Sequence, residues 1–483
     1  MKKSWEKNKF LLVILTLVFL LRLPSFFDPY SYGDEGIYLT LGEGIRQGLT
    51  LYREIHDNKP PLLYLLAAIS GSLFWFRFFL LAANLTTIYL FSLLAKILFP
   101  AKVKVQKTAL VIFALLSTLP LIEGNIANAE IFMILPIIGA IILFFKQKPS
   151  LKSYLFIGIL FSLATLFKIP AAFDFAALFV FLVFFKTERK FLQRLKDSVI
   201  LAFAFFLPIL ATFIYFWRQN AATYYFTAAF AQNLPYLSSW GGQAKSAVPN
   251  PGLLIRALLV LGLSAGLWLK QKTINRPLIF VSVWFAFSIF ATLLSGRPYP
   301  HYLIQVLPSF AFLAAIFLSK PQAREKFLSL LLLGVLFFSI IYFRFWGYPV
   351  FSYYQNFLAF AFGQKTQTEY FQNFSSKVPQ TYELAEFITT HTAPNEKVFI
   401  WGDSPVVYAL SHRLPPGRYT ASYHIIDFGA QEETIDILKK ETPRFIINLN
   451  DENRPFSQLE TLISQDYALF KNIHQAQIFH RLP

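Results

Sequence analysis

Long hydrophobic runs fill the first 345 residues and limit what this chain can fold into. A run of about 17 to 23 apolar residues is long enough to cross a lipid bilayer as a helix. Eleven such runs lie near residues 10–27, 76–98, 107–123, 130–146, 152–168, 170–186, 198–217, 251–269, 277–295, 302–319 and 327–345. The sequence therefore predicts an all-α polytopic membrane domain, with about eleven transmembrane helices.

The cationic side chains indicate how these helices are oriented. Lys and Arg gather in alternate connections, at residues 2–9, 102–107, 146–152, 186–196, 270–276 and 320–326, and such loops usually stay on the cytoplasmic side. The connections at 28–75, 124–129, about 218–250 and 296–301, and everything after 345, are then expected to face outward. Segment 61–75 is apolar but short, so we expect an interfacial or re-entrant helix there.

The net charge of +17 fits this topology. The cations form short clusters between apolar runs rather than one stripe or tail, so we expect membrane lipids as partners and no nucleic acid. We expect a multi-pass protein of the cell (inner or cytoplasmic) membrane, with the N-terminus in the cytoplasm and the C-terminal part outside.

The tail after residue 345 has fewer apolar residues and predicts a small outward-facing α/β domain. Helix-like stretches at 382–390 and 432–440 alternate with strand-like runs at 398–401 and 444–448. The expected domains are therefore a membrane domain at 1–345 and a soluble α/β domain at 346–483.

The most polar stretch of the N-terminal half is the first outward loop. Asp34 and Glu35 follow Gly33 at the start of a helix-like run, where Asp34 could simply be an N-cap. Alternatively, a carboxylate at the membrane surface could act as a general base. Lys59, before two prolines at the end of the loop, could be a snorkelling anchor or could contact a substrate.

Further candidates lie at the outer ends of later spans. Glu130 begins a span, where a carboxylate is costly unless it is solvated or paired, and Glu123 is a weaker candidate nearby. The run GRPYPHY presents side chains suited to binding phosphate, although interfacial Tyr and Arg are common anyway. They are Arg297, Tyr299, His301 and Tyr302.

Other features exclude several chemistries. Lys168 and Asp174 flank a proline, and their spacing would permit a local ion pair, so we expect a structural role for both. The chain has no cysteine, which excludes disulfides and thiolate nucleophiles. It also has no GxxxxGK[ST], HExxH or GxSxG motif, so ATP-driven transport, zincin proteolysis and α/β-hydrolase chemistry have no support.

Four segments in order resemble the GT-C superfamily of polyprenyl-phosphate-dependent glycosyltransferases. They are GDEGIY, YREIHDNKPPLLY, ANAEIF and GRPYPHYLIQVLP, and the resemblance is to the branch with protein O-mannosyltransferases and the lipid A aminoarabinose transferase. It implies a GT-C-like fold with interfacial helices in the first loop. It also implies an inverting sugar transfer from a polyprenyl-phosphate donor to an envelope lipid, glycan or protein. The chain lacks the β-trefoil of the eukaryotic mannosyltransferases, which weakens the case for a protein acceptor.

The resemblance also implies roles for individual residues. Asp34 stands in the place of the family's catalytic acid, with Glu35 as its partner, and Lys59 matches a position that contacts the donor phosphate. His301 and Tyr302 would lie near the same leaving group, and we group Arg297 with them. Glu130 matches an acid that helps to hold the acceptor, or a divalent metal ion where one is used.

Two other classes of function remain open. A transporter or flippase of lipid-linked sugars would also be polytopic, but it would favour ionisable residues at mid-span rather than at one interface. A non-catalytic subunit that binds polyprenyl lipid would need Lys59 and His301 but not Asp34. Replacing Asp34 by Asn separates an enzyme from a binder.

Overall fold

The computed structural model describes residues 2–234, 237, 251–319, 322–450 and 454–483, which form two compact units. Unit 1 comprises Met1–Leu23, Phe78–Tyr215 and Ala231–Val350. Unit 2 comprises Pro24–Arg77, Phe216–Phe230 and Phe351–Pro483. The first outward loop and the tail thus belong to one unit, and the expected domain boundary after residue 345 remains a prediction.

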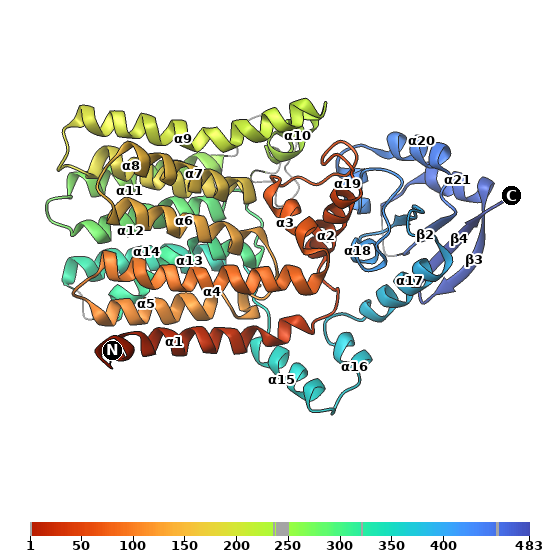
Figure 1. Cartoon of the computed structure of the whole chain (residues 1–483), viewed down its shortest axis with the longest axis horizontal. Helices are drawn as coiled ribbons and strands as arrows, with labels where there is room; N and C mark the ends of the chain where they lie inside the picture. Colours follow the sequence, from red (N-terminus) through yellow and green to blue (C-terminus); the bar gives the residue numbers. More distant parts are fainter. Residues whose placement is uncertain (1, 235–236, 238–250, 320–321, 451–453) are drawn as a thin grey trace. The chain divides into compact units, whose positions relative to one another are not determined.

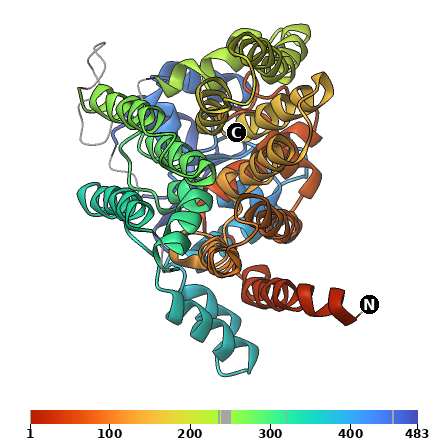
Figure 2. The same ribbon diagram turned by 90° about the vertical axis from the view of Figure 1, so that its left-hand side faces the viewer.

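Unit 1 is a bundle of helices that lie side by side (Figures 1 and 2). Each of the eleven predicted spans is helical, which confirms the predicted fold class. The helices are α1 (Lys2–Arg22), α4 (Leu73–Leu98), α5 (Val103–Leu116), α6 (Ala129–Lys146), α7 (Leu151–Phe167), α8 (Ala172–Phe185), α9 (Phe191–Arg218), α11 (Pro251–Leu269), α12 (Arg276–Thr292), α13 (Leu303–Phe317) and α14 (Ala323–Tyr342).

These helices make the chain a multi-pass membrane protein. Among the described residues, seven helices are long and apolar enough to cross a membrane: α1, α4, α6, α9, α11, α13 and α14, some with a few flanking residues. Three apolar helices are shorter, and they correspond to α7, α8 and α12. The remaining predicted span is α5, which has only 14 residues.

Helix α13 lies at the centre of unit 1. It contacts α5, α6, α12 and α14, and 78% of its span is buried. Stacked rings fill the space beside it: Phe91 lies 4.4 Å from Phe113 and 4.6 Å from Phe312 between ring centroids. By contrast, only 6% of the span in α11 is buried, so its apolar side chains suit a lipid environment.

Short 3-10 helices lead into several spans of unit 1. They are η2 (Pro120–Ile122), η3 (Ile169–Ala171) and η5 (Pro300–Tyr302), each with a proline in its first two positions. Elements η2 and η5 contact each other although they lie far apart in the sequence. Two further short ones are η1 (Leu23–Phe26) and η4 (Ala231–Asn233).

Unit 2 contains ten short helices, counting the described residues only, and one sheet. The helices are α2 (Gly33–Arg46), α3 (Leu62–Ser70), α10 (Ala222–Ala229), α15 (Val350–Ala361), α16 (Gln367–Gln372), α17 (Val378–His391), α18 (Val406–Ser411), α19 (Ser422–Asp427), α20 (Gln431–Glu441) and α21 (Ser457–Asp466). The strands are β1 (Phe399–Trp401), β2 (Phe445–Asn448), β3 (Tyr467–Ile473) and β4 (Ala476–Arg481).

The sheet has the order β1-β2-β4-β3, in which β1 and β2 are parallel and the other pairs are antiparallel. Alternate side chains of a strand point to opposite faces, so Ile400 and Phe399 join different cores. Helices α17 and α18 cover the Ile400 face, while α20 and α21 cover the Phe399 face (Figure 1). The predicted α/β tail is confirmed.

Helix α2 packs closely between α3 and α18. A Cβ added to Gly36 would lie 2.6 Å from the backbone nitrogen of Val406, and one added to Gly42 would lie 2.7 Å from the carbonyl carbon of Ala67. Glycine is therefore required at both positions. The backbone N–H of His56 also donates to the carbonyl of Arg418 at 2.9 Å, which ties the first loop to the tail.

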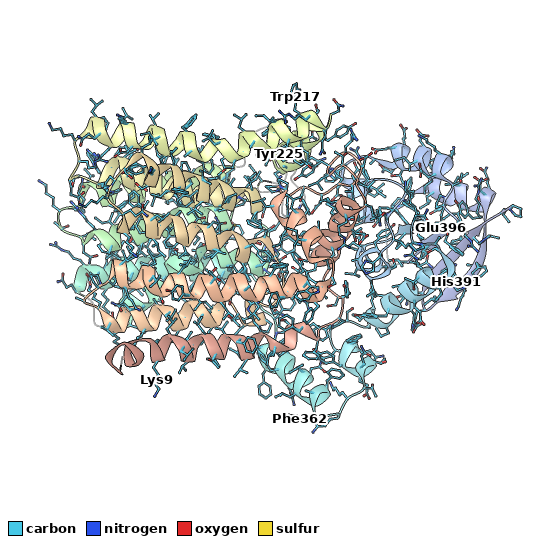
Figure 3. The ribbon with its side chains drawn as sticks, in the orientation of Figure 1. Lys9, Trp217, Tyr225, Phe362, His391 and Glu396 are labelled. Atoms are coloured by element: carbon cyan, nitrogen blue, oxygen red, sulfur yellow. The ribbon has the colours of Figure 1, made fainter. Side chains whose placement is uncertain are left out.

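Aromatic rings close the other side of this loop. Tyr225, labelled in Figure 3, lies between Tyr52 and Phe216, with ring centroids at 5.2 and 4.6 Å. Tyr52 is fully buried, and its hydroxyl donates to the carbonyl of Lys59 at 2.8 Å. The end of the loop that carries Lys59 is therefore held by α10 packing.

Candidate functional site

Asp34 lies in the first turn of α2, and it does not cap that helix. The N-cap is Tyr32, with no hydrogen bond from a side chain, so the N-cap interpretation of Asp34 is wrong. The Tyr38 hydroxyl, one turn later, donates to Asp34 Oδ2 at 2.8 Å. The Asp34 side chain is 33% exposed, so this carboxylate is held in place and still accessible.

Lys59 lies beside this carboxylate. Its Nζ is 3.6 Å from Asp34 Oδ2 and 3.7 Å from Asp57 Oδ2, and it lies 4.9 Å from the centre of the Tyr38 ring. The Lys59 backbone N–H donates to the Tyr64 hydroxyl at 3.0 Å. Two carboxylates therefore share one ammonium group. The predicted roles of Asp34 and Lys59 remain predictions.

Asp57 extends this cluster toward the tail. It is buried, accepts a 2.7 Å hydrogen bond from the Tyr64 hydroxyl, and lies 3.6 Å from Nε2 of His424 in α19. Burial alone would raise the pKa of Asp57, but Lys59, His424 and the Tyr64 hydrogen bond together hold that pKa below its usual value. Asp57 is thus a buried anion supported by residues of both the loop and the tail.

Glu35 points away from the Asp34 cluster into a buried charge network. Arg77 donates through Nε and Nη2 to its two carboxylate oxygens at 3.1 and 2.7 Å. Arg77 Nη1 lies 3.5 Å from Asp28 Oδ2, and Asp28 also accepts hydrogen bonds from Tyr353 and Tyr370 at 2.9 Å each. This bidentate ion pair favours a structural role for Glu35. Its predicted role in catalysis remains a prediction.

The second cluster lies in unit 1 and contains three of the predicted residues: Glu130, His301 and Tyr302. Glu130 forms an ion pair with Lys168, whose Nζ also lies 4.0 Å from the centre of the Tyr302 ring. His301 Nε2 is 3.8 Å from Glu130 Oε1. The turn before α6 and the connection before α13 are therefore adjacent in unit 1, and their predicted outward orientation remains a prediction.

The remaining predicted residue, Arg297, lies in the same connection as His301 and is half-buried. Its backbone N–H donates to the Ser295 hydroxyl at 3.2 Å. Its predicted part in binding phosphate remains a prediction.

Lys168 and Asp174 do not form the local ion pair that their spacing would permit. Lys168 instead pairs with Glu130 at the start of the neighbouring helix α6, while Asp174 accepts hydrogen bonds from three neutral donors: Trp284 Nε1 at 2.6 Å, Ser288 Oγ at 2.9 Å and Gln305 Nε2 at 2.7 Å. Proximity in sequence misled the prediction, because the turn at η3 directs the two side chains to different helices.

A large groove lies between α11, α12 and α14, with a volume of about 1240 Å³. Leucine, isoleucine and phenylalanine side chains form most of its wall, and Arg256 and Arg344 are its charged lining residues. Arg256 lies 5.6 Å from the centre of the Phe343 ring and donates through Nε to the carbonyl of Gly252 at 3.0 Å. The groove thus combines an apolar wall with the guanidinium groups of Arg256 and Arg344.

Metal binding was left open by the sequence. Within the part of the chain that the structure describes, no three His, Asp or Glu side chains are grouped so that they could hold a metal ion. We therefore assign no step to a metal.

Sequence reasoning missed several of these residues. Arg256 had a visible signal, because a cation within an apolar span is costly and marks function by default. For Lys168 the sequence indicated only a structural role. Asp57 and His424 had no signal, because only the fold brings α19 to the first loop.

Comparisons with known proteins find solved structures that are similar to this chain. The chain is similar to ArnT from Cupriavidus metallidurans bound to undecaprenyl phosphate, with a TM-score of 0.60, 12% identity and 98% of each chain covered. It is also similar to the apo state of that protein, with a TM-score of 0.57, 12% identity and coverage of 99% and 98%. No family model and no curated protein matches the sequence. The likeness confirms the predicted GT-C-like fold.

Proposed function

We propose that this chain is a membrane glycosyltransferase that moves a sugar from a polyprenyl-phosphate donor to an envelope lipid, glycan or protein. The fold supports the proposal, since a protein of the same fold, ArnT, has been crystallised with undecaprenyl phosphate. The observation that carries it is the Asp34 carboxylate, which is 33% exposed and held by Tyr38 and Lys59.

Asp34 is assigned as the general base. Its Oδ2 accepts a hydrogen bond from the Tyr38 hydroxyl and lies 3.6 Å from the Lys59 ammonium, and the carboxylate would take a proton from the acceptor. The acceptor oxygen or nitrogen attacks the anomeric carbon, the bond from that carbon to the phosphate oxygen breaks, and its electron pair leaves with the lipid phosphate. Attack opposite the leaving group inverts the anomeric centre.

Cationic groups would stabilise the departing phosphate. We assign this role to Lys59 of unit 2. For His301, Tyr302 and Arg297 of unit 1 we propose a separate part in binding the donor. Glu130, paired with Lys168, is assigned to holding the acceptor. Cleavage of the bond between the sugar and the lipid phosphate supplies the free energy of transfer, so the reaction requires no nucleotide-binding site.

The groove between α11, α12 and α14 suits the lipid tail of the donor. Its volume of about 1240 Å³ and mainly aliphatic and aromatic wall match an isoprenoid chain, and Arg256 would attract an anionic head group. A transporter is less well supported. Transport does not need a general base, whereas we assign Asp34 that role among the described ionisable residues.

The test is transfer of a labelled sugar from a polyprenyl-phosphate donor to an extract of the cell envelope by purified, reconstituted protein. Asp34→Asn should abolish transfer, because the amide cannot accept the proton, while donor binding persists. Lys59→Ala should weaken donor binding. Glu54→Gln is the matched control, since Glu54 is a 42% exposed carboxylate in the same loop.

Unchanged transfer by the Asp34→Asn protein would refute the assignment of the base. A wild type that binds the donor but transfers nothing to any fraction of the envelope would instead favour the non-catalytic binding subunit. Movement of intact donor across the membrane by wild type and Asp34→Asn alike would favour a flippase.

A further inference from the structure

Asp57 is a buried carboxylate that the proposed reaction does not use. Its side chain is 2% exposed, and the Tyr64 hydroxyl donates to its Oδ2 at 2.7 Å. An ionised carboxylate is costly to bury unless it is hydrogen-bonded and paired with a cation. Lys59 supplies that cation, with its Nζ at 3.7 Å from Asp57 Oδ2.

The three charged groups of this cluster differ in their access to solvent. The side chains of Asp34, Lys59 and Asp57 are 33%, 20% and 2% exposed, respectively. Lys59 Nζ lies 3.6 Å from Asp34 Oδ2, almost the same as its distance from Asp57 Oδ2. The ammonium group is therefore shared between an accessible carboxylate, which is the assigned base, and a buried one.

The buried end of this arrangement is held by its surroundings. Tyr64 is fully buried, and its hydroxyl donates to Asp57 and also accepts the backbone N–H of Lys59 at 3.0 Å. The other oxygen of Asp57, Oδ1, lies 3.6 Å from Nε2 of His424 in the tail. A lysine side chain is long and flexible, so a carboxylate fixed in this way restricts where the ammonium group can lie.

Sharing the ammonium group matters for a general base. A nearby cation favours the ionised form of a carboxylate and so makes that carboxylate a poorer proton acceptor. The negative charge of Asp57 offsets part of the charge of Lys59. Lys59 can then lie beside Asp34 without neutralising it.

We propose that Asp57 is a positioning residue, which holds the Lys59 ammonium group beside the Asp34 base and prevents it from pairing with Asp34 alone. This inference rests on the proposed function, in which Asp34 takes the proton of the acceptor and Lys59 meets the donor phosphate. Asp57 touches neither substrate and acts through Lys59.

The substitution Asp57→Asn tests the inference, because the amide keeps the shape of the side chain and loses its charge. The ammonium group should then pair with Asp34 alone, and the rate of sugar transfer at saturating donor should fall about 10-fold or more. Binding of undecaprenyl phosphate to the full-length protein in nanodiscs should not weaken, since removal of a negative charge favours an anionic ligand. A residue with only a structural role would not separate the two measurements in this way.

A double-mutant cycle tests whether Asp57 acts through Lys59. The transfer rate at saturating donor is measured for wild type, Asp57→Asn, Lys59→Ala and the double variant. In the Lys59→Ala background, Asp57→Asn should not lower the rate further, because no ammonium group is left to misplace. It should also raise the thermal midpoint in that background, because Asp57 is there a buried anion that has lost its cation.

Tyr64→Phe is a second variant, which removes the hydroxyl that fixes Asp57 and keeps both charges. It should lower the rate by a smaller factor, about 3-fold, and it tests the inference even if Asp57→Asn does not fold. Glu54→Gln is the matched control, since it neutralises a different carboxylate of the same loop, 3.5 Å from Arg53. Neither the rate nor the binding should change in this control.

The outcomes distinguish this inference from the proposed function. An unchanged rate for Asp57→Asn, equal losses in the wild-type and Lys59→Ala backgrounds, or weaker donor binding by Asp57→Asn would overturn the inference while the proposed function stands. A wild type that transfers no sugar, or unchanged transfer by Asp34→Asn, would overturn the proposed function and this inference with it.

Discussion

Replacing His56 by phenylalanine should make the protein more resistant to acid. The imidazole is 3% exposed and lies among the rings of Tyr419, Phe428 and His424, at 5.3, 5.3 and 6.3 Å. Burial, assisted by the neighbouring His424 and Arg418 and partly opposed by Asp57, lowers the pKa of His56 from 6.5 to about 4. Folding therefore opposes protonation of this ring.

The sign and size of the effect follow from linkage. The folded-state pKa is below the unfolded value, so the unfolded chain binds the proton first, and stability falls as the pH drops through 6.5 toward 4. A shift of this size corresponds to about 3 kcal/mol in total, of which about 2 kcal/mol is lost between pH 7 and pH 5. Phenylalanine cannot take the proton, so the variant loses none of this free energy of unfolding at low pH.

The assay is thermal unfolding of the detergent-solubilised protein at pH 7 and pH 5, followed by tryptophan fluorescence. One kcal/mol shifts the midpoint by about 2–4 °C in a domain of 150–250 residues. The midpoint of His56→Phe relative to wild type should therefore rise by about 4 °C or more on acidification. His474→Asn is the control, because the His474 side chain is 49% exposed, and its relative midpoint should not change.

The reasoning would be refuted if the difference between His56→Phe and wild type were the same at both pH values. If the midpoint of His56→Phe fell far below that of wild type at pH 7, the effect of the substitution on packing would exceed its effect on protonation.

Three further predictions concern unit 2. Arg77→Ala should destabilise it by about 3–5 kcal/mol, because Glu35 and Asp28 are then left buried without their cation; thermal unfolding measures this, and an unchanged midpoint would contradict the buried network. Burial raises the pKa of Asp28 to about 6, so acidification from pH 7 to 5 stabilises the fold at this position by about 1 kcal/mol. Asp28→Asn should remove that gain, which is measured by comparing midpoints at both pH values. Gly36→Val should impair folding and yield, since its side chain would meet the Val406 backbone at 2.6 Å; normal yield and melting would show that α2 can shift.

The sequence was sufficient for the spans because length and apolarity decide membrane insertion, and all eleven runs became helices. It also located the strands β1 and β2, whose apolar runs are buried on both faces. It missed β3 and β4, because the middle of β3, which includes Leu469 and Phe470, is exposed and gives no alternating pattern.

The candidate site was predictable only where a residue lies close to its partners in sequence or motif. Asp34 and Lys59 occupy one loop, and the sequence analysis singled out both as candidates. The bidentate pair of Glu35 with Arg77 was not, since it depends on the direction in which successive residues of α2 point. The contact of Glu123 with His301 depends on η2 and η5 meeting, and no local pattern encodes a contact between residues 178 positions apart.

The close fit of Gly36 against Val406 has a practical consequence for constructing chimaeras. A tail grafted from a distant relative would bring its own α18 surface, and α2 would have to accommodate it at a position where no side chain fits. Recombination should therefore succeed when residues 24–77 are transferred together with the tail and fail when the tail is transferred alone. The boundary that matters for such exchange is set by this glycine, not by the end of the last membrane helix.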